Sequence, residues 1–401
     1  MRVLGLFLII LFFSFSPLYA EEHTPEVSII TVLPGDAIHT AFGHSAIKVD
    51  NRLYNYGTFS FHAPGFLSNF VKGKMQYYLG IERFDRVLFR YIHREDRSIY
   101  EQKLNLTPEQ TGELIKFLRF NARKENKYYD YEFVKDNCSS RIRDVLVRVL
   151  GEEITFSDAV SEQIGEKSYR DYIRSYLGNH PWFDAGIQFT LGTVADRKVP
   201  AEDAFFLPEM VLDQFRGCNL TGDSHFIYES ELPPGLKGGN KTLLPGINPP
   251  VLTFSLLIAA EILLYLMALR KKIPGTLLKV FETSAVVINL LGGILLFYLM
   301  FFSAHFAVKG NLHILWLTPL SLILLCTMHL QDKRIAKVVA TVLFSAALTS
   351  VAVFAAGFQK TCTAYYPAVI FYLAVYLRII LLPLPGIAEA ADTGSFVKGN
   401  I

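Results

Sequence analysis

The chain has 401 residues, of which 51% are hydrophobic and 19% are charged, and its formal net charge is +2. With a mean hydropathy of +0.29, this composition excludes a single ordinary soluble domain, and 13% aromatic residues exclude a disordered chain. The small net charge argues against a nucleic-acid partner. Residues 21–250 carry 27 Lys and Arg against 32 Asp and Glu, whereas residues 251–401 carry 11 against 5. We therefore expect a water-soluble part followed by a membrane part.

The first 20 residues have the pattern of a secretory signal peptide. A single basic residue, Arg2, precedes a long apolar run, and Ala20 stands before the acidic Glu21. An uncleaved anchor helix is the alternative interpretation. Either one places residues 21–235 in the periplasm, where they would form the catalytic domain.

Strands are expected at the start of this domain. The β-branched run 28–32 predicts the first strand, and the runs 45–49 and 53–57 flank an Asp50-Asn51 turn, which predicts a hairpin.

Two helices are then expected. Thr107, Pro108 and Gln110 have the pattern of an N-cap, a first-turn proline and a capping box. A second helix follows with apolar residues at i, i+3, i+4 and i+7 from Ile142, and Gly151 is expected to end it. The soluble domain is therefore predicted to be α+β.

The candidate nucleophile is Cys138, which is expected just before this second helix. The helix dipole and the free amides there favour a thiolate, and Arg141 adds positive charge. Such a thiolate can attack a carbonyl group while the amides hold the resulting oxyanion. His44, at the entrance of a predicted strand, is the candidate base, and Asp136 or Asn137 could orient it or bind the oxyanion.

Plainer interpretations of the same residues stay open. Cys138 could form a disulfide with Cys218 in an oxidising compartment, and His44 could be a structural histidine. His39 and His62 lie near His44, but no further cysteine or carboxylate stands at metal-ligand spacing, so no metal is expected. The sequence contains no phosphate loop or dinucleotide fingerprint, and no diffusible cofactor is expected.

The second half of the chain predicts membrane helices. A Pro- and Gly-rich linker at 236–249 precedes a membrane domain at 250–385, and a cytoplasmic tail follows at 386–401. Five spans are expected, at about 250–269, 283–304, 312–330, 336–358 and 363–384.

The loop charges predict the orientation. The basic residues of the loops lie mainly at 270–279 and 333–337, whereas the alternate loops carry only Lys309 and Lys360. The positive-inside rule then puts the soluble domain in the periplasm and the C-terminus in the cytoplasm of a multi-pass inner-membrane protein. Arg378 is expected to snorkel to the cytoplasmic interface, and Glu261 to bond to another span.

Several stretches, taken in order, resemble one bacterial family. They are FGHSAIKV, LYNYGTFSF, FVKGKMQYYL, DRSIYEQKLNLT, YYDYEFVKDNCSSRIRD, PWFDAGIQFTLGTVADRKVPAEDAFFLPEM and FFSAHFAVKGNLHILWLTPL. The family is the Lnb N-terminal periplasmic domain family. It resembles a permuted papain/NlpC-like thiol fold in which the His strand precedes the Cys helix, here followed by an all-α five-helix transmembrane domain.

The resemblance implies a lipoprotein N-acyltransferase like those of Bacteroidota. Such an enzyme takes an acyl chain from a membrane phospholipid and transfers it to the α-amino group of a diacylated lipoprotein. Carried over to this sequence, the family's acyl-carrying cysteine is Cys138 and its base is His44. Ser140 and Thr318 depart from the family pattern, in which Thr and Asn are common at these positions.

Other residues are expected near the substrates. Tyr56 could line the site, and Arg141 could contact substrate. His305, His313 and Trp316 fall near the periplasmic ends of spans, where they would bind a lipid headgroup or acyl chain, or only anchor the helices at the interface.

Two other functions fit the same residues. A thiol dyad hydrolyses amides in NlpC-like folds, so a cell-wall peptidase or amidase is one alternative. A non-enzymatic periplasmic binding module, with a Cys138–Cys218 disulfide, is the other.

Overall fold

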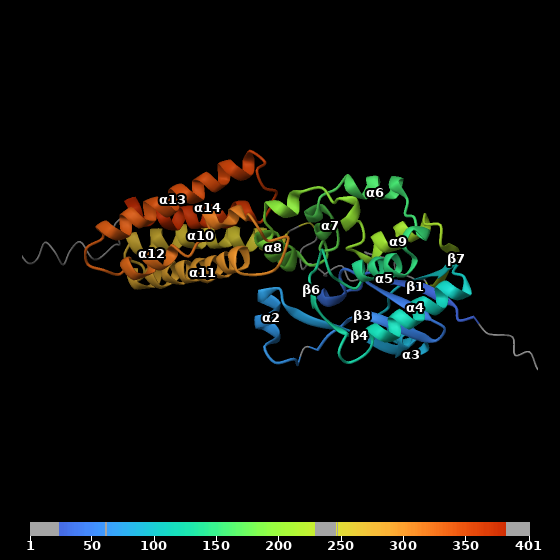
Figure 1. Cartoon of the computed structure of the whole chain (residues 1–401). Coiled ribbons are helices and arrows are strands. Elements are labelled where there is room, and N and C mark those ends of the chain that lie inside the picture. Colours follow the sequence, from blue (N-terminus) through green and yellow to red (C-terminus); the bar gives the residue numbers. More distant parts are fainter. Residues whose placement is uncertain (1–23, 61, 229–245, 247, 382–401) are drawn as a thin grey trace, which may run out of the picture.

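The computed structural model describes residues 24–60, 62–228, 246 and 248–381 (Figure 1). The predicted signal peptide, most of the predicted linker and the predicted tail lie outside these residues. The described chain forms a sheet domain that is followed by a helical region (Figure 1).

A seven-stranded antiparallel sheet forms the centre of the first domain. Its strand order is β6-β4-β3-β2-β1-β5-β7. The strands are β1 (Val27–Val32), β2 (His44–Val49), β3 (Arg52–Thr58), β4 (Met75–Arg83), β5 (Ile99–Leu104), β6 (Tyr128–Tyr131) and β7 (Thr221–Tyr228). The expected hairpin is confirmed, since β2 and β3 pair from Val49 and Arg52 and Asp50 takes a φ of 48° in the turn.

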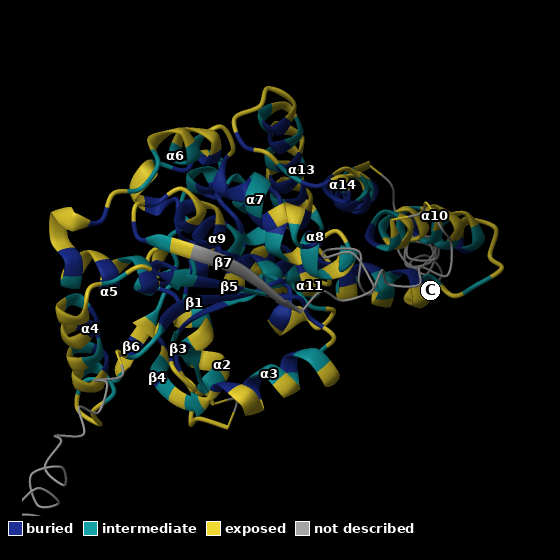
Figure 2. Ribbon diagram, turned by 90° about the vertical axis from the view of Figure 1, so that its right-hand side faces the viewer, coloured by how far each residue is buried: buried dark blue, intermediate teal, exposed yellow. Residues whose placement is uncertain are grey.

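Helices cover both faces of the sheet. On one face, α3 (Phe84–His93) packs against Ile30 and Ala46. The other face, with Ile29 and Ile47, carries α4, α5 and α9 (Figure 2). These helices span Pro108–Asn121, Ser140–Leu150 and Pro208–Arg216.

The two predicted helices of this domain are α4 and α5. Thr107 and Gln110 form the expected capping box of α4. The C-cap of α5 is Gly151, which has a positive φ of 55°. The remaining helices of the domain are α2 (Phe66–Lys72), α6 (Asp158–Gly165), α7 (Tyr169–Ser175) and α8 (Pro181–Thr190).

The helical region consists of α10 (Pro249–Leu269), α11 (Gly275–Phe301), α12 (Ser321–Thr327), α13 (Arg334–Ala355) and α14 (Tyr365–Leu381). Within the described residues, α10, α11 and α13 are long and apolar enough to cross a membrane, and α14 is an apolar helix of 17 residues. α14 packs against both α10 and α13.

The third expected span is not one continuous helix. A short 3-10 helix, η5 (Leu312–Leu315), is followed by a turn at Pro319 and then by α12. The side chain of Asn289, from α11, bonds the backbone groups that the break leaves without helical partners. Its Nδ2 donates to the Trp316 carbonyl at 2.9 Å, and its Oδ1 accepts from the Thr318 backbone amide at 3.3 Å. Irregular backbone is tolerated at this depth only when protein groups bond it in this way.

Arg378 does not snorkel. It is buried and forms an ion pair through two hydrogen bonds with Glu282 of α11. A charge removed from water needs a partner, and here the partner comes from a neighbouring helix rather than from the interface.

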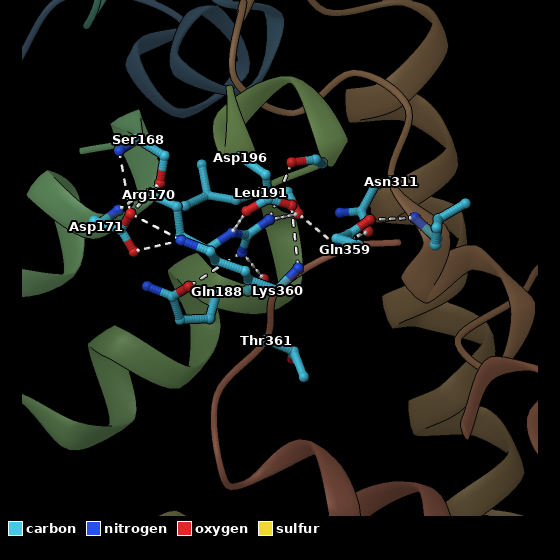
Figure 3. A network of polar contacts seen from close by, with 12 residues as sticks. Ser168, Arg170, Asp171, Gln188, Leu191, Asp196, Asn311, Gln359, Lys360 and Thr361 are labelled. Atoms are coloured by element: carbon cyan, nitrogen blue, oxygen red, sulfur yellow. Dashed lines mark hydrogen bonds and ion pairs between the residues drawn. The ribbon is translucent and has the colours of Figure 1, made fainter. Parts of the chain in front are cut away.

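A buried polar network joins the sheet domain to the helical region (Figure 3). Arg170 of α7 is only 2% exposed and donates to Asp196 at 2.6 Å, to Gln188, and to the carbonyls of Leu191 and Gly192 at 3.0 Å.

The loops of the helical region complete this network. Gln359 donates to the Leu191 carbonyl at 3.0 Å, and Asn311 donates to the Phe189 carbonyl at 2.8 Å. The backbones at Gly192 and Lys309 approach so closely that a Cβ at Gly192 would lie 1.9 Å from the Lys309 carbonyl oxygen. The network therefore fixes the position of the soluble domain on the helices.

Candidate active site

Cys138 lies just before α5, as expected, in a turn that Asn137 holds in place. The Asn137 side-chain oxygen accepts from the amides of Ser139 and Ser140 at 2.7 and 3.0 Å. Its amide donates to the carbonyls of Phe133 and Phe206. Because every polar atom of this side chain is used, Asn137 neither contacts His44 nor offers a donor to an oxyanion. Its role is to position the thiol.

The Cys138 thiol is free and enclosed by hydrogen-bond donors. The backbone amides of Ser45 and of Cys138 itself point to the sulfur, and the Ser139 hydroxyl lies 4.0 Å from it. These donors favour the thiolate, but burial outweighs them and raises the pKa of the thiol. The thiol is therefore protonated at neutral pH in this resting structure.

His44 begins β2, and its ring lies against Gly57 and Asn55 of β3. A Cβ at Gly57 would lie 2.5 Å from the imidazole Cε1, so only glycine leaves room for the ring. The Asn55 side chain bonds the imidazole and supports its protonated form, while Nε2 is buried and has no partner. This assigns the proton to Nδ1 and leaves the Nε2 lone pair free to accept another. Burial, together with the charge of Arg97, lowers the pKa of His44 to about 4.

The orienting residue of His44 is thus Asn55, which the sequence analysis missed. The hairpin register contains the necessary signal. Pairing Val49 with Arg52 puts Gly57 opposite His44 and Asn55 two residues away on the same face. Asn55 also accepts from the Gly57 amide at 2.8 Å, at a register irregularity of β3 against β4.

Cys138 and His44 lie at the same end of β2 but on opposite faces of the sheet. The Ser45 hydroxyl lies 3.3 Å from the Ser139 hydroxyl, so Ser45 faces α5, and its neighbour His44 points to the opposite face. β2 pairs with β3 only from Ile47 to Val49, so its edge toward β3 is open at His44 and Ser45, whereas its other edge pairs there with Val32 and Thr31 of β1. Among the described contacts, no hydrogen bond joins the thiol to the imidazole.

Three other expected site residues form a cluster of their own. Arg141 binds Asp136 through hydrogen bonds of 2.6 and 2.8 Å, and its guanidinium lies 3.6 Å from the ring centre of Tyr129. Asp136 therefore does not orient His44. Tyr56 is buried, accepts from Asn121 at 3.2 Å, and has a pKa raised by burial to about 12. Within this cluster the two hydrogen bonds occupy Nε and Nη2 of Arg141.

An open groove of about 740 Å³ lies beside His44. Its lining includes Asn55, Gly57, Phe59 and Arg97 as well as His44. The Cys138 side chain does not line it, so the groove reaches the imidazole from the face of the sheet opposite to the thiol.

The three residues expected near a lipid headgroup have different surroundings. His313 and Trp316 are buried in the helical region, where the Trp316 indole donates to His313 Nδ1 at 2.8 Å. Thr361 binds the other nitrogen of His313 at 3.2 Å. Both rings are therefore occupied by structural contacts. His305 instead contacts α2, where its Nε2 bonds the Phe70 carbonyl at 2.8 Å.

The two shifted pKa values predict how Cys138 reacts with an alkylating agent. Burial raises the pKa of the thiol and lowers that of His44 to about 4, so both groups are neutral between about pH 4 and pH 8. The rate of alkylation by iodoacetamide should therefore rise about tenfold per pH unit up to pH 9. The measurement needs a Cys326→Ala background, because Cys326 is exposed.

A thiolate–imidazolium pair would behave differently. It would give a rate that is independent of pH between about pH 4 and pH 8, with His44 charged throughout. Such a plateau, lost in a His44→Ala variant, would contradict the neutral resting state.

Cys138 and Cys218 are both free thiols, and Cys218 contacts the Thr221 hydroxyl instead. The structure therefore does not contain the disulfide that the non-enzymatic alternative requires.

Comparisons with known proteins cover both parts of the chain. Residues 20–176 match the family model described as the Lnb N-terminal periplasmic domain, and residues 242–384 match the one described as the Lnb transmembrane domain. Neither the curated proteins nor the solved structures gave a match. The two family domains follow one another in the same order as the sheet domain and the helical region. The chain is therefore a membrane protein with a periplasmic domain, and it belongs to the Lnb family.

Proposed function

We propose that this protein is a lipoprotein N-acyltransferase. It takes an acyl chain from a membrane glycerophospholipid and carries it as a thioester on Cys138. It then transfers the chain to the α-amino group of the diacylglyceryl-cysteine of a lipoprotein. The observation that carries the proposal is the free thiol of Cys138 at the start of α5, in a domain that belongs to the Lnb family and is fixed to membrane helices.

In the first half-reaction the Cys138 sulfur attacks the ester carbonyl carbon while His44 Nε2 takes the thiol proton. The amides of Cys138 and Ser45, which already point to the sulfur, are the donors available to the oxyanion. The carbon–oxygen ester bond then breaks, the imidazolium returns the proton to the leaving alkoxide, and a lysophospholipid departs.

In the second half-reaction the lipoprotein amine attacks the thioester carbonyl. An amide bond forms, the carbon–sulfur bond breaks, and the amine proton passes through His44 to the thiolate. The cycle consumes no oxidant, metal or diffusible cofactor.

The mechanism requires the thiol and the imidazole to come within hydrogen-bond distance. Catalytic hydrogen bonds are often long in a free enzyme and shorten when substrate binds. The open end of β2 is where this approach would occur, because β2 and β3 are not paired at His44 and Ser45.

The membrane helices fit two lipid-anchored substrates. An enzyme fixed at the membrane surface meets donor and acceptor at a high effective concentration, an advantage that a cell-wall hydrolase would not gain. The basic residues at 270–279 and 333–337 are then cytoplasmic, and so is the C-terminus.

The test uses the full-length protein in phosphatidylethanolamine vesicles with a synthetic diacylglyceryl-cysteine peptide. We expect the peptide to gain the mass of one acyl chain on its α-amine, and the vesicles to accumulate one lysophospholipid per product. Cleavage of amide bonds in peptidoglycan fragments, with no acylated peptide formed, would instead assign the protein to the amidases.

A further inference from the structure

One short helix of the soluble domain has no buried residue. In α2, Leu67 is 71% exposed and Phe70 is 53% exposed. Exposed apolar side chains on a helix with flanking lysines are typical of a segment that lies in a membrane interface. Here the exposed lysines are Lys72, at the end of the helix, and Lys74 just after it.

The position of α2 agrees with its composition. Figure 1 shows it on the side of the sheet domain that faces the helical region, beside the end of α11. The Ala304 amide, which follows α11, donates to the Lys72 carbonyl at 2.8 Å, and His305 bonds the Phe70 carbonyl. Since α11 is long and apolar enough to cross a membrane, these hydrogen bonds hold α2 beside the end of a candidate membrane span.

The backbone contact at this point is too close for a side chain. Gly73 ends α2 with a φ of 67°, and a Cβ there would lie 2.9 Å from the His305 backbone nitrogen. The end of α11 continues the apolar surface of α2, because Phe301 and Phe302 are 58% and 67% exposed.

Aromatic rings lead from α2 toward the thiol. Phe66 of α2 stacks on Phe59 at a centroid distance of 6.3 Å, and Phe59 lies 4.8 Å from Tyr77. Tyr77 in turn stacks on Tyr131 at 4.1 Å. Tyr77, Tyr131 and Cys138 pack against the same core of the sheet domain, where burial raises the pKa of both tyrosines and a thiolate at Cys138 would raise them further.

We propose that α2 lies in the outer leaflet of the inner membrane and receives the acyl chain of the donor phospholipid. The row of rings Phe66, Phe59 and Tyr77 then guides this chain to Cys138. The proposal rests on the acyltransferase function, and it adds the place where the donor enters and the side chains that line its route.

The membrane position of α2 can be tested without any activity. A Leu67→Trp variant is placed in vesicles of phospholipid brominated on the acyl chains, which quench tryptophan at short range. The matched control is Phe120→Trp on α4, where Phe120 is 50% exposed on another part of the domain. The parent protein, with Trp182 and Trp316, gives the baseline.

We expect additional quenching for Leu67→Trp and none for Phe120→Trp. Equal quenching of the two added tryptophans, or none for either, would overturn the proposal whether or not the protein proves to be an acyltransferase.

The route is tested by comparing two donors. In a Leu67→Gln/Phe70→Gln variant, acylation of Cys138 by bilayer phospholipid should fall at least about tenfold, because two apolar anchors are lost. Release of nitrophenol from water-soluble p-nitrophenyl acetate should stay unchanged, because that ester does not enter from the bilayer. Phe59→Ser should likewise lower acylation by bilayer phospholipid and leave nitrophenol release unchanged. Phe120→Gln should change neither rate.

A full bilayer rate in the α2 double variant would overturn the proposed route. If the unmodified protein is acylated by neither donor, the acyltransferase function fails instead, and the quenching result still decides where α2 lies.

Discussion

Replacing Cys138 by alanine is expected to abolish acyl transfer and to leave the fold intact. The variant loses the only atom that can carry the acyl chain, so the rate should fall by at least about 10³-fold. The cost to stability is small, because the sulfur has only weak partners, the Ser139 hydroxyl at 4.0 Å and the amides of Ser45 and Cys138, and Asn137 holds the turn without it. The measurement is lipopeptide acylation in vesicles, beside the thermal unfolding midpoint.

Cys218→Ala is the matched control. Cys218 is also a free thiol of the sheet domain, but it is buried and contacts the Thr221 hydroxyl. This variant should keep full activity. Loss of activity in both variants would indicate a general effect of removing thiols, and full activity in Cys138→Ala would refute the proposed nucleophile.

Replacing Arg170 by methionine is expected to give the largest loss of stability. The substitution removes the buried donor of the Gln188 side chain and the Gly192 carbonyl, and it leaves the Asp196 carboxylate without its cationic partner. The Leu191 carbonyl keeps only its bond from Gln359. Removing one partner of a buried ion pair costs about 3–5 kcal/mol. Because these groups lie where the sheet domain meets the helices, we also expect faster proteolysis at this junction.

The control for Arg170 lies on the same helix. Arg174 is exposed, so Arg174→Met should change the unfolding midpoint little. A second test pairs Arg170→Met with Asp196→Asn, which removes the uncompensated carboxylate and should recover part of the loss. An unchanged midpoint in Arg170→Met would show that the network does not fix the two parts together.

The local pattern of the sequence predicted much of the soluble fold. The Asp50-Asn51 turn gave the hairpin, Thr107 and Gln110 gave the start of α4, and Gly151 gave the end of α5. These features succeed because a turn or a cap is determined by residues a few positions apart.

Features that depend on distant contacts were not predictable in the same way. The third span is interrupted at Pro319, and the backbone opened there is bonded by Asn289 of α11, a contact that no local pattern reveals. Arg378 finds Glu282 on another helix for the same reason. No sequence pattern around Arg170 predicted its buried network, because its partners come from α8 and the following residues.

In the candidate site, too, local features were predictable and distant contacts were not. The pattern around Cys138 and His44 predicted a thiol before a helix and an imidazole at the start of a strand, and both lie there. The partners of Asp136 and Tyr56 depend on tertiary contacts: Asp136 pairs with Arg141, and the Tyr56 hydroxyl accepts from Asn121.

The intact mass of the full-length protein after incubation with phosphatidylethanolamine vesicles tests the central claim most directly. The account predicts an added mass of one acyl chain that hydroxylamine removes and that Cys138→Ala does not acquire. An unmodified protein would contradict it, provided that iodoacetamide alkylates Cys138 in the same sample at alkaline pH. An adduct that persists in Cys138→Ala would contradict it equally.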